Sequence, residues 1–380
     1  MKLVVLLMLG LAGANCARIQ SRVAEDCNPD ICNSQSCRCF NPGVTPGGLS
    51  PQDIPQIVLV TFDDAVTSLL YSNYYSDAFA NRQNPNGCPV GATFFMSHEY
   101  SDYESVNKLW NSGHEIALHS ITHTSSPDYW TQATADELAK EFNDQRDMIA
   151  HFANIPSADI SGLRTPFLLL GGDATFQMIT DNNFLYDCSW PTQSFVGKGL
   201  YPYSLDYKSN QDCNVGVCPT ESHPGAWVLP MVDWIGANGY ACAMVDTCVS
   251  GATGANELLE FIKTNFHRHY DNYREPFGFY VHAAWFNTNS TNYEAFKMFL
   301  DYVGTLNDAY VVTAKQAIEW TRNPTNTGGA ANTFGCPAKE PAVCNKRTCN
   351  LQKPGEGERI MVSCVDCPPN YPWLGNPLGQ

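Results

Sequence analysis

The chain has 380 residues, and its 22 Lys and Arg against 38 Asp and Glu give a formal net charge of −16. An excess of negative charge this large argues against nucleic acid and anionic membrane surfaces as partners, since both attract basic proteins. Hydrophobic residues make up 44% of the sequence and charged residues only 16%, so the chain has enough apolar material for a large core and is not disordered.

The first residues have the pattern of a secretory signal. Met1 and Lys2 are followed by an apolar run over residues 3–11 and by small residues that suit a cleavage site. Because the run is too short to cross a bilayer, we expect a signal peptide over residues 1–16 and a secreted protein with no membrane anchor. Cleavage is allowed on either side of Cys16, so the sequence leaves open whether that cysteine stays in the mature chain.

Of the 16 cysteines, four crowd residues 27–39 and five crowd residues 336–367, while six central ones, Cys188 among them, are expected to hold loops in place. In a secreted protein such clusters predict disulfides. A zinc knuckle is the rival interpretation, but tight thiolate clusters belong mostly to reducing compartments. We therefore expect two extensions held by disulfides, an N-terminal one over residues 17–52 and a C-terminal one over residues 326–380 that packs on the rest. A sequon at Asn289 is consistent with secretion and glycosylation.

Between these extensions, over residues 53–325, strands and helices alternate in the order typical of a parallel α/β fold. In chain order the sequence predicts strands at 57–62, 92–96 and 115–118, a helix at 135–152, a strand at 160–163, a helix at 174–181, strands at 184–187 and 227–229, a helix at 256–270, a strand at 277–282, a helix at 293–306, a strand at 309–312 and a helix at 314–321. Seven or eight strands are too many for a small open sheet, so we expect a distorted (β/α) barrel. Residues 191–224 lack periodicity and are expected to form an ordered loop.

Two adjacent carboxylates, Asp63 and Asp64, end the first predicted strand. They lie at the edge where α/β barrels place their active sites. Burying such a pair is costly unless the carboxylates are paired or bind a metal. A helix N-cap is the structural alternative, because Asp is favoured there.

Two histidines, His119 and His123, follow the third predicted strand in the same way. Two imidazoles and one carboxylate are a common open ligand set for Zn²⁺ or a related divalent metal. The spacing alone is weak support, since a chain with nine histidines produces it by chance. Its position directly after a strand makes a metal site the stronger interpretation.

Three more strand ends carry polar residues that chemistry can use. Arg164 follows a short strand and is suited to hold a carboxylate through two hydrogen bonds. Asp187 and His282 end two later strands, and an Asp that accepts a ring proton would make a histidine a usable general acid. Taken singly, a surface arginine and a buried core histidine are the ordinary alternatives. Five polar motifs at five strand ends point instead to one site.

Aromatic residues in or near these motifs are candidates for a sugar-binding groove. The candidates are Trp130, Trp190, Trp234 and Trp285. Because tryptophan is also a good core residue, we expect one or two of them to line the groove and the others to be buried.

In order along the chain, five motifs resemble those of the polysaccharide deacetylases with a NodB-type domain. They are Thr-Phe-Asp-Asp (61–64), His-Ser-Ile-Thr-His (119–123), Arg-Thr-Pro-Phe (164–167), Asp-Cys-Ser-Trp (187–190) and the strand that ends in His282. The cysteine cluster that leads into the first motif further resembles that of arthropod chitin deacetylases. The resemblance covers about residues 25–370, and it implies carbohydrate esterase family 4 chemistry on a distorted (β/α) barrel.

The resemblance implies a metal and a base. Asp64, His119 and His123 would be the ligands of Zn²⁺, or of another divalent metal such as Co²⁺ or Mn²⁺. Asp63 would be the general base, and Arg164 would hold it in place.

The resemblance also implies the remaining roles. Phe167 would offer its backbone N–H to the oxyanion, Asp187 would tune His282, and His282 would be the general acid. Two positions depart from the usual pattern: many members have Tyr where Phe167 stands, and Leu is usual where Tyr280 stands. Tyr280 could alter the pocket for the acetyl methyl group and is therefore a candidate substrate contact.

These assignments imply a monomeric, secreted, metal-dependent deacetylase acting on N-acetylglucosamine units of chitin or chito-oligosaccharides and giving chitosan and acetate. Five C-terminal cysteines do not fit the six-cysteine chitin-binding module, so soluble oligomers or a gut lining matrix fit better as substrates than rigid cuticle. Two alternatives remain: another acetylated polysaccharide, because the motifs serve the reaction and not the sugar, and a non-catalytic chitin-matrix binding protein. A glycosidase pair built on Asp63 would leave the histidines and Arg164 without a role.

Overall fold

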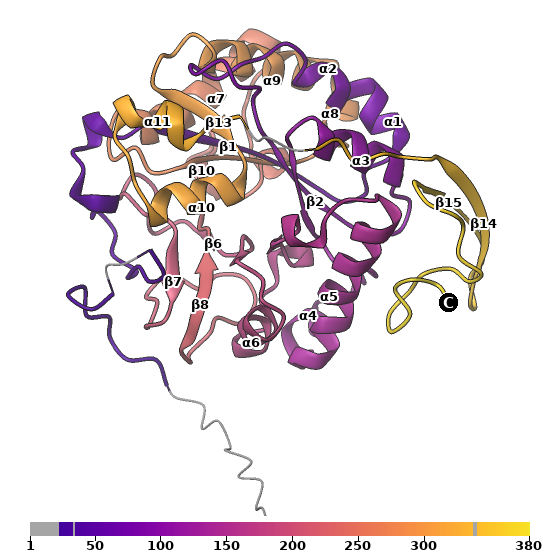
Figure 1. The fold of residues 1–380 in the computed structure, drawn as a ribbon. Helices are drawn as coiled ribbons and strands as arrows, with labels where there is room; N and C mark the ends of the chain where they lie inside the picture. Colours follow the sequence, from indigo (N-terminus) through magenta and orange to yellow (C-terminus); the bar gives the residue numbers. More distant parts are fainter. Residues whose placement is uncertain (1–22, 33–34, 337–339) are drawn as a thin grey trace, which may run out of the picture.

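A computed structural model of the chain describes residues 23–32, 35–336 and 340–380 (Figure 1). The expected signal peptide and Cys16 lie outside the described residues. Eight strands form a sheet in the order β12-β1-β2-β3-β4-β5-β8-β7, and a ninth, β13, also pairs with β1. All neighbours are parallel except β7 and β8, and the sheet curls into an open barrel with β7 and β12 at its edges. The expected distorted barrel is confirmed.

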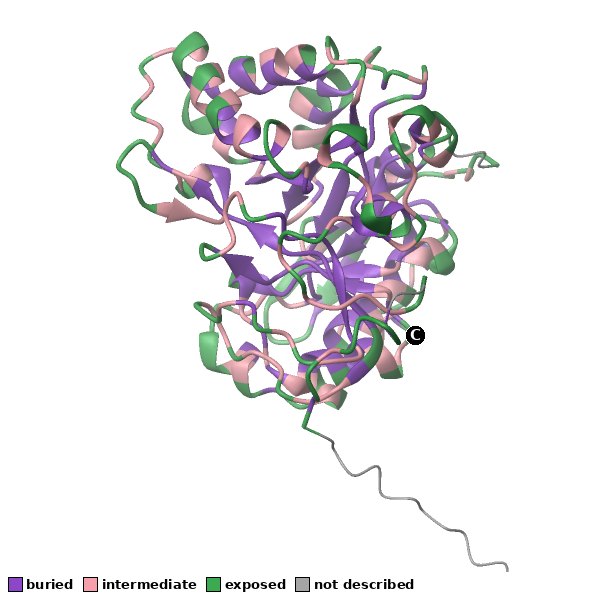
Figure 2. Cartoon of the chain, turned by 90° about the vertical axis from the view of Figure 1, so that its left-hand side faces the viewer, coloured by how far each residue is buried: buried purple, intermediate pink, exposed green. Residues whose placement is uncertain are grey.

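The strands of this sheet are mostly buried and lie at the centre of the molecule (Figure 2). They are β1 (Gln56–Asp63), β2 (Thr93–Met96), β3 (Glu115–Leu118), β4 (Gly162–Leu163), β5 (Tyr186–Asp187), β7 (Tyr203–Leu205), β8 (His223–Val228), β12 (Phe277–His282) and β13 (Ala309–Val312). Three two-stranded sheets pair β6 (Pro191–Thr192) with β9 (Met231–Val232), β10 (Trp234–Ile235) with β11 (Ala241–Cys242), and β14 (Arg347–Lys353) with β15 (Gly357–Ser363).

Helices surround the sheet and contribute their apolar faces to its outer layer (Figure 1). They are α1 (Ser68–Leu70), α2 (Ser76–Ala78), α3 (Tyr103–Asn111), α4 (Pro127–Gln132), α5 (Ala135–Phe152), α6 (Asp173–Asp181), α7 (Ala255–Tyr270), α8 (Trp285–Thr288), α9 (Ser290–Val303), α10 (Ala314–Arg322) and α11 (Thr327–Thr333). Two single turns, η5 (Pro166–Leu168) and η6 (Val245–Thr247), follow β4 and precede α7, respectively. None of the helices described here is long and apolar enough to cross a membrane.

Side-chain alternation along β1 decides what faces the inside of the barrel. Phe62 packs outward against Phe296 of α9, with ring centroids 6.1 Å apart. Leu59 instead joins the interior cluster that contains Tyr280 of β12. Asp63 has the same parity as Leu59 and so lies on the inner side, at the carboxyl end of the strand.

Helix α10 closes the amino-terminal end of the barrel. Its first amides bond to the first residues of two strands: Ala314 N–H donates to Thr93 Oγ1 at 2.9 Å, and Lys315 N–H donates to Glu115 Oε2 at 2.9 Å. Trp320, near the other end of the helix, is fully buried. The opposite end, where the parallel strands reach their carboxyl ends, is the end that carries the polar motifs.

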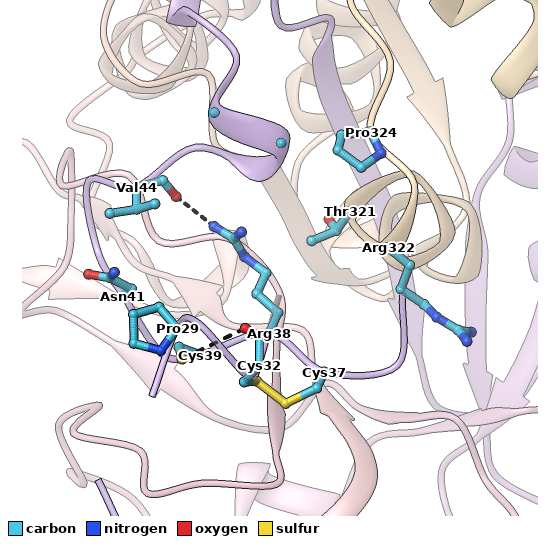
Figure 3. A pocket seen from close by; sticks show the side chains of 12 residues that line it. Pro29, Cys32, Cys37, Arg38, Cys39, Asn41, Val44, Thr321, Arg322 and Pro324 are labelled. Atoms are coloured by element: carbon cyan, nitrogen blue, oxygen red, sulfur yellow. Dashed lines mark hydrogen bonds between the residues drawn. A yellow bond between two sulfur atoms is a disulfide. The ribbon is translucent and has the colours of Figure 1, made fainter. Parts of the chain in front are cut away.

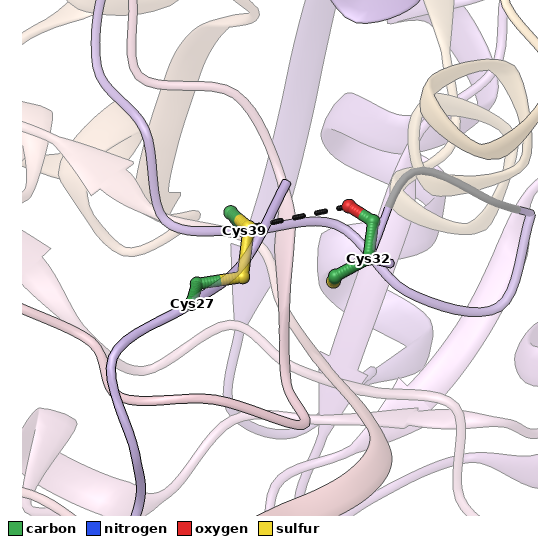
Figure 4. A group of neighbouring side chains, drawn as sticks. All are labelled: Cys27, Cys32 and Cys39. Atoms are coloured by element: carbon green, nitrogen blue, oxygen red, sulfur yellow. Dashed lines mark hydrogen bonds between the residues drawn. A yellow bond between two sulfur atoms is a disulfide. The ribbon is translucent and has the colours of Figure 1, made fainter. Parts of the chain in front are cut away.

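Disulfides hold both extensions. The N-terminal one contains Cys27–Cys39 (Figure 4) and Cys32–Cys37, which confirms disulfides over zinc for these thiols. Cys88–Cys336 ties the chain after α11 to the segment before β2, and hairpin β14–β15 is held by Cys344–Cys364 and Cys349–Cys367. Cys188 was expected to pin a loop; that expectation is wrong, because the residue is a buried free thiol.

A pocket of about 320 Å³ lies between the Cys32–Cys37 disulfide and the end of α10 (Figure 3). Thr321 and Arg322 at the end of that helix, and Pro324 just beyond it, line one side of the pocket. This disulfide therefore lies near the closed end of the barrel, and the polar motifs lie at the opposite end.

Candidate active site

Three side chains from two strand ends converge at the open end of the barrel. Asp64 follows β1, His119 and His123 follow β3, and their ligand atoms all lie within 4.8 Å of one another. Asp64 Oδ1 lies 3.2 Å from His123 Nε2 and 3.8 Å from His119 Nε2. The Asp64 side chain is 48% exposed, so this donor set fits a divalent metal with coordination positions open to solvent.

The tautomer of His119 suits a metal ligand. Its Nδ1 lies 2.8 Å from the carbonyl oxygen of Arg164, which can only accept, so Nδ1 carries the proton and Nε2 keeps its lone pair towards Asp64. Burial lowers the pKa of His119 to about 4, and the ring is therefore neutral. A ring nitrogen fixed by a backbone carbonyl is the usual arrangement behind a metal-bound histidine.

Helix α5 holds the loop between the two histidines. Glu141 Oε2 accepts hydrogen bonds from the backbone N–H groups of Ile121 at 3.0 Å and Thr122 at 2.9 Å. Gln145 Nε2 donates to the carbonyl of Ser120 at 2.8 Å. We did not predict these two residues from the sequence, although polar side chains on the apolar face of a helix were a signal for them.

Arg164 holds Asp63 from inside the barrel. Its Nη1 donates to Asp63 Oδ1 at 2.5 Å and to Thr61 Oγ1 at 2.9 Å. On the other side its Nε donates to the Cys188 carbonyl at 2.6 Å, and its Nη2 lies 3.0 Å from Cys188 Sγ. Arg164 is fully buried and Asp63 nearly so, so the expected pairing of these two residues is observed.

Burial would raise the pKa of the Asp63 carboxyl, but the charge and hydrogen bond of Arg164, together with the charge of His282, outweigh it and hold that pKa below its ordinary value. Asp63 is therefore ionised at neutral pH although its side chain is buried. A carboxylate in this state can accept a proton.

His282, at the end of β12, is paired with Asp246 and not with Asp187. Its Nδ1 lies 2.7 Å from Asp246 Oδ2 in η6. Burial lowers the pKa of His282, but the hydrogen bond to Asp246 and the charges of Asp63, Asp246 and Asp64 raise it to about 9. The ring is therefore protonated at neutral pH. The prediction that Asp187 would tune His282 is wrong.

Asp187 instead fixes the turn that follows Arg164. Its carboxylate accepts hydrogen bonds from Ser189 N–H at 2.9 Å and from Ser189 Oγ at 2.5 Å. Ser189 Oγ in turn accepts from Thr165 N–H at 2.8 Å. Asp187 is fully buried, and both of its carboxylate oxygens bond to Ser189.

Phe167 lies at the tip of that turn. Its φ is 57°, its side chain is half exposed, and its ring centroid lies 5.1 Å from that of His123. The turn therefore lies beside the Asp64, His119 and His123 group, as the motif order implied.

Four of the five aromatic candidates for substrate contact are core residues. Trp130, Trp190, Trp234 and Tyr280 are at most 2% exposed, so their prediction as substrate contacts is wrong. Each buried polar atom is satisfied inside the protein: the Trp234 N–H, for example, donates to the Gly278 carbonyl at 2.8 Å. Only Trp285 of this set is partly exposed, at the start of α8 just beyond His282.

Comparisons with known proteins agree with the geometry. A solved family 4 carbohydrate esterase from Streptomyces lividans aligns with a TM-score of 0.37 and 13% identity, covering 67% of this chain and 91% of that one, a likeness too low to argue from. Residues 51–177 match the polysaccharide deacetylase family. The chain is 42% identical to chitin deacetylase 8 of Bombyx mori over 362 residues, 94% of either protein. It is 37% identical to chitin deacetylase 1 of the same species over 375 residues, 94% of this chain and 69% of the relative. The chain therefore belongs to the polysaccharide deacetylase family and is a deacetylase.

Proposed function

We propose that the enzyme hydrolyses the N-acetyl group of N-acetylglucosamine units in chitin or chito-oligosaccharides, giving chitosan and acetate. Identity of 42% to a chitin deacetylase over 94% of the chain supports this substrate. In the site, the observation that carries the reaction is an ionised, arginine-bound Asp63 next to the Asp64, His119 and His123 group.

Asp64, His119 and His123 would hold the metal, which we propose to be Zn²⁺, with Co²⁺ or Mn²⁺ as alternatives. Two imidazoles and one carboxylate are a donor set that Zn²⁺ accepts readily while keeping a position open for catalysis. When bound, such a metal lowers the pKa of water and polarises a carbonyl group.

Asp63 would act as the general base. Asp63 ends β1 on the inner side of the barrel, and Asp64 follows the strand with a positive φ, so the two carboxylates would divide the roles of base and ligand. Arg164 keeps Asp63 ionised and fixes one of its oxygens. The other oxygen is the one that would take a proton from water as that water attacks the acetyl carbonyl.

His282 would act as the general acid. Asp246 accepts the Nδ1 proton, so the transferable proton of the imidazolium is the one on Nε2. Giving it to the nitrogen of the sugar lets the amine leave, a step worth roughly 10²- to 10⁴-fold in rate. The backbone N–H of Phe167 would stabilise the tetrahedral oxygen, a contribution of about 3 kcal/mol for one donor.

We further propose that residues 53–325 form the catalytic barrel, flanked by the extensions at 17–52 and 326–380. Trp285 is the aromatic residue that we retain as a substrate contact, because it is partly exposed beside the strand end of His282. The seven disulfides among the described residues are typical of an oxidising compartment and support secretion of the protein, which we propose to be a monomer.

The test is acetate release from a defined chitin oligosaccharide by the purified protein, before chelation, after chelation and after Zn²⁺ is added back. We expect release that stops with the chelator and returns with the metal. Bound metal at one equivalent without acetate release from any chitin oligomer would contradict chitin as substrate and favour another acetylated polysaccharide.

A further inference from the structure

The disulfide Cys242–Cys248 closes a short loop, here called the Asp246 loop (residues 242–248). Its single turn, η6, carries Asp246, whose Oδ2 lies 2.7 Å from His282 Nδ1. The other oxygen, Asp246 Oδ1, is buried and has no hydrogen-bond partner among the described residues. No second side chain therefore orients this carboxylate, and its position depends on the backbone of the loop.

The backbone of the Asp246 loop has few bonds of its own. Met244 O accepts from Thr247 N–H at 3.0 Å and from Thr247 Oγ1 at 2.7 Å, and Cys248 N–H donates to Val245 O at 3.1 Å. A single turn of this kind is marginal without a tertiary constraint. The covalent link between Cys242 and Cys248 supplies that constraint.

The loop is anchored to the strand that carries His282. Cys242 lies opposite Trp234 in the β10–β11 pair, and the Trp234 ring N–H donates to Gly278 O of β12 at 2.8 Å. Gly278 precedes His282 by four residues on that strand. Through Cys242, Trp234 and Gly278, the disulfide thus connects the loop that carries Asp246 to the strand that carries His282.

We propose that the Cys242–Cys248 disulfide is a positioning element of the active site, which holds Asp246 against His282 and so keeps the general acid oriented. The inference rests on the proposed role of His282. Cys242 and Cys248 touch neither substrate nor metal in this account and act only through Asp246.

The test uses the full chain with metal bound and compares Cys242→Ala/Cys248→Ala with the wild type on a chitin oligosaccharide. We expect kcat to fall about 10- to 100-fold, as it does when a partner behind a functional histidine is lost, with little change in KM. The matched control is Cys32→Ala/Cys37→Ala, which opens a loop of nearly the same size (separation 5 against 6) at the closed end of the barrel and should leave kcat unchanged.

A double-mutant cycle separates positioning from general destabilisation. In the Asp246→Asn background, removing the Cys242–Cys248 disulfide should cost less than about twofold in kcat, because the group that it positions is already gone. Equal losses in both backgrounds would overturn the inference, as would an undiminished kcat in the otherwise wild-type chain.

If the alanine pair does not fold, folded wild-type enzyme is reduced in steps with a phosphine, reloaded with Zn²⁺ and mapped for free thiols by mass spectrometry. Activity should fall in step with reduction of Cys242–Cys248 and not of Cys32–Cys37; any other order overturns the inference. A His282→Ala enzyme with normal turnover would instead show that the proposed role of His282 is wrong, whatever the disulfide does.

Discussion

Backbone strain is concentrated at the residues of the active site. Ten described non-glycine residues have a positive φ, and four of them, Asp64, Ser120, His123 and Phe167, lie in the site motifs. A fifth, Leu168, directly follows one of these motifs. Such conformations cost of order 1–3 kcal/mol each and persist where the surroundings force them, so the loops around the metal ligands are held in position at the expense of stability.

Replacing Asp63 by Asn should leave the metal site intact and abolish catalysis. The amide keeps the size of the carboxylate and still accepts a hydrogen bond from Arg164, but it cannot take a proton. We expect acetate release to fall by roughly 10²- to 10⁴-fold, the range for a lost general base, while metal content stays at one equivalent.

His119→Ala is the matched comparison for Asp63→Asn, because it removes a proposed ligand and should lose metal and activity together. Turnover and metal content are measured on the same preparations. Wild-type turnover in Asp63→Asn would show that Asp63 is not the base.

The pH dependence of kcat/KM should show the titration of two groups, one that must be deprotonated and one that must be protonated. Activity requires ionised Asp63, whose pKa lies below its ordinary value, and protonated His282, whose pKa is raised to about 9. The rate therefore rises as pH passes the low pKa of Asp63 and falls as pH rises through that of His282. Asp246→Asn removes contributions that raise the His282 pKa, so the alkaline limb should move to lower pH with the same metal bound. An unmoved alkaline limb would assign that limb to another group.

The sequence was informative about Asp63 and His282 but not about the carboxylate that pairs with His282. Asp187 was the candidate because it ends a strand, as the other motif residues do. Asp246 comes from a short turn outside the sheet, and its contact with His282 depends on how the segment between β8 and α7 folds back. Spacing along the chain carries no signal for such a contact, although the two flanking cysteines indicated a constrained loop.

At the scale of elements, helix α5 supports the metal site from behind the sheet. Its capping box fixes the start of the helix: Thr134 Oγ1 accepts from Glu137 N–H, and Glu137 accepts from Thr134 N–H. With the start fixed, the helical period places Glu141 and Gln145 on the buried face, under the loop of the two histidines.

Glu141→Ala should weaken both the fold and the metal site. It leaves the N–H groups of Ile121 and Thr122 without their acceptor, and an unpaired buried donor costs about 1–3 kcal/mol. We expect the free energy of unfolding to fall by roughly 2 kcal/mol or more, and metal affinity to fall about 10- to 100-fold as for other supports of metal ligands. Urea denaturation and metal titration measure the two effects.

Lys140→Ala, at an exposed position of the same helix, is the control for Glu141→Ala and should change neither quantity. A Glu141→Ala enzyme with undiminished metal affinity would show that the histidine loop keeps its shape without this carboxylate.

Elements with a strong period could be predicted from the sequence with their bounds, whereas β4 and β5 were predicted two residues too long and other short elements were missed. The strands Glu115–Leu118 and Phe277–His282 and the helix Ala135–Phe152 have the predicted bounds, because each buries a continuous apolar run or a clear helical face. The two-residue strands such as β6 and β10, and helix α3, were missed. Tertiary contacts decide those segments, and local patterns do not carry that information.

At the scale of the whole molecule, the barrel is closed at one end and open at the other. Helix α10 bonds to the starts of β2 and β3, so the interior is filled by packed side chains and only the carboxyl ends of the strands are free for chemistry. The alternating pattern of strands and helices predicted this architecture, but the cysteine pairing that ties distant segments together was beyond the sequence, because many pairings of the same cysteines are compatible with it.

The Cys88–Cys336 disulfide should contribute more to stability than the disulfides that close short local loops. It joins residues 248 positions apart, whereas Cys32–Cys37 joins residues 5 apart. Cross-linking removes more entropy from the unfolded chain as the loop grows, and a loop beyond 100 residues corresponds to about 4.7 kcal/mol or more in the chain-entropy account. We therefore expect Cys88→Ser/Cys336→Ser to lower the free energy of unfolding by about 2–5 kcal/mol, the range found for native disulfides, and Cys32→Ser/Cys37→Ser to lower it by less. Both variants are compared by urea denaturation under conditions that keep the remaining disulfides intact. Equal losses in the two variants would show that native packing at the bond, and not restriction of the unfolded chain, sets its contribution.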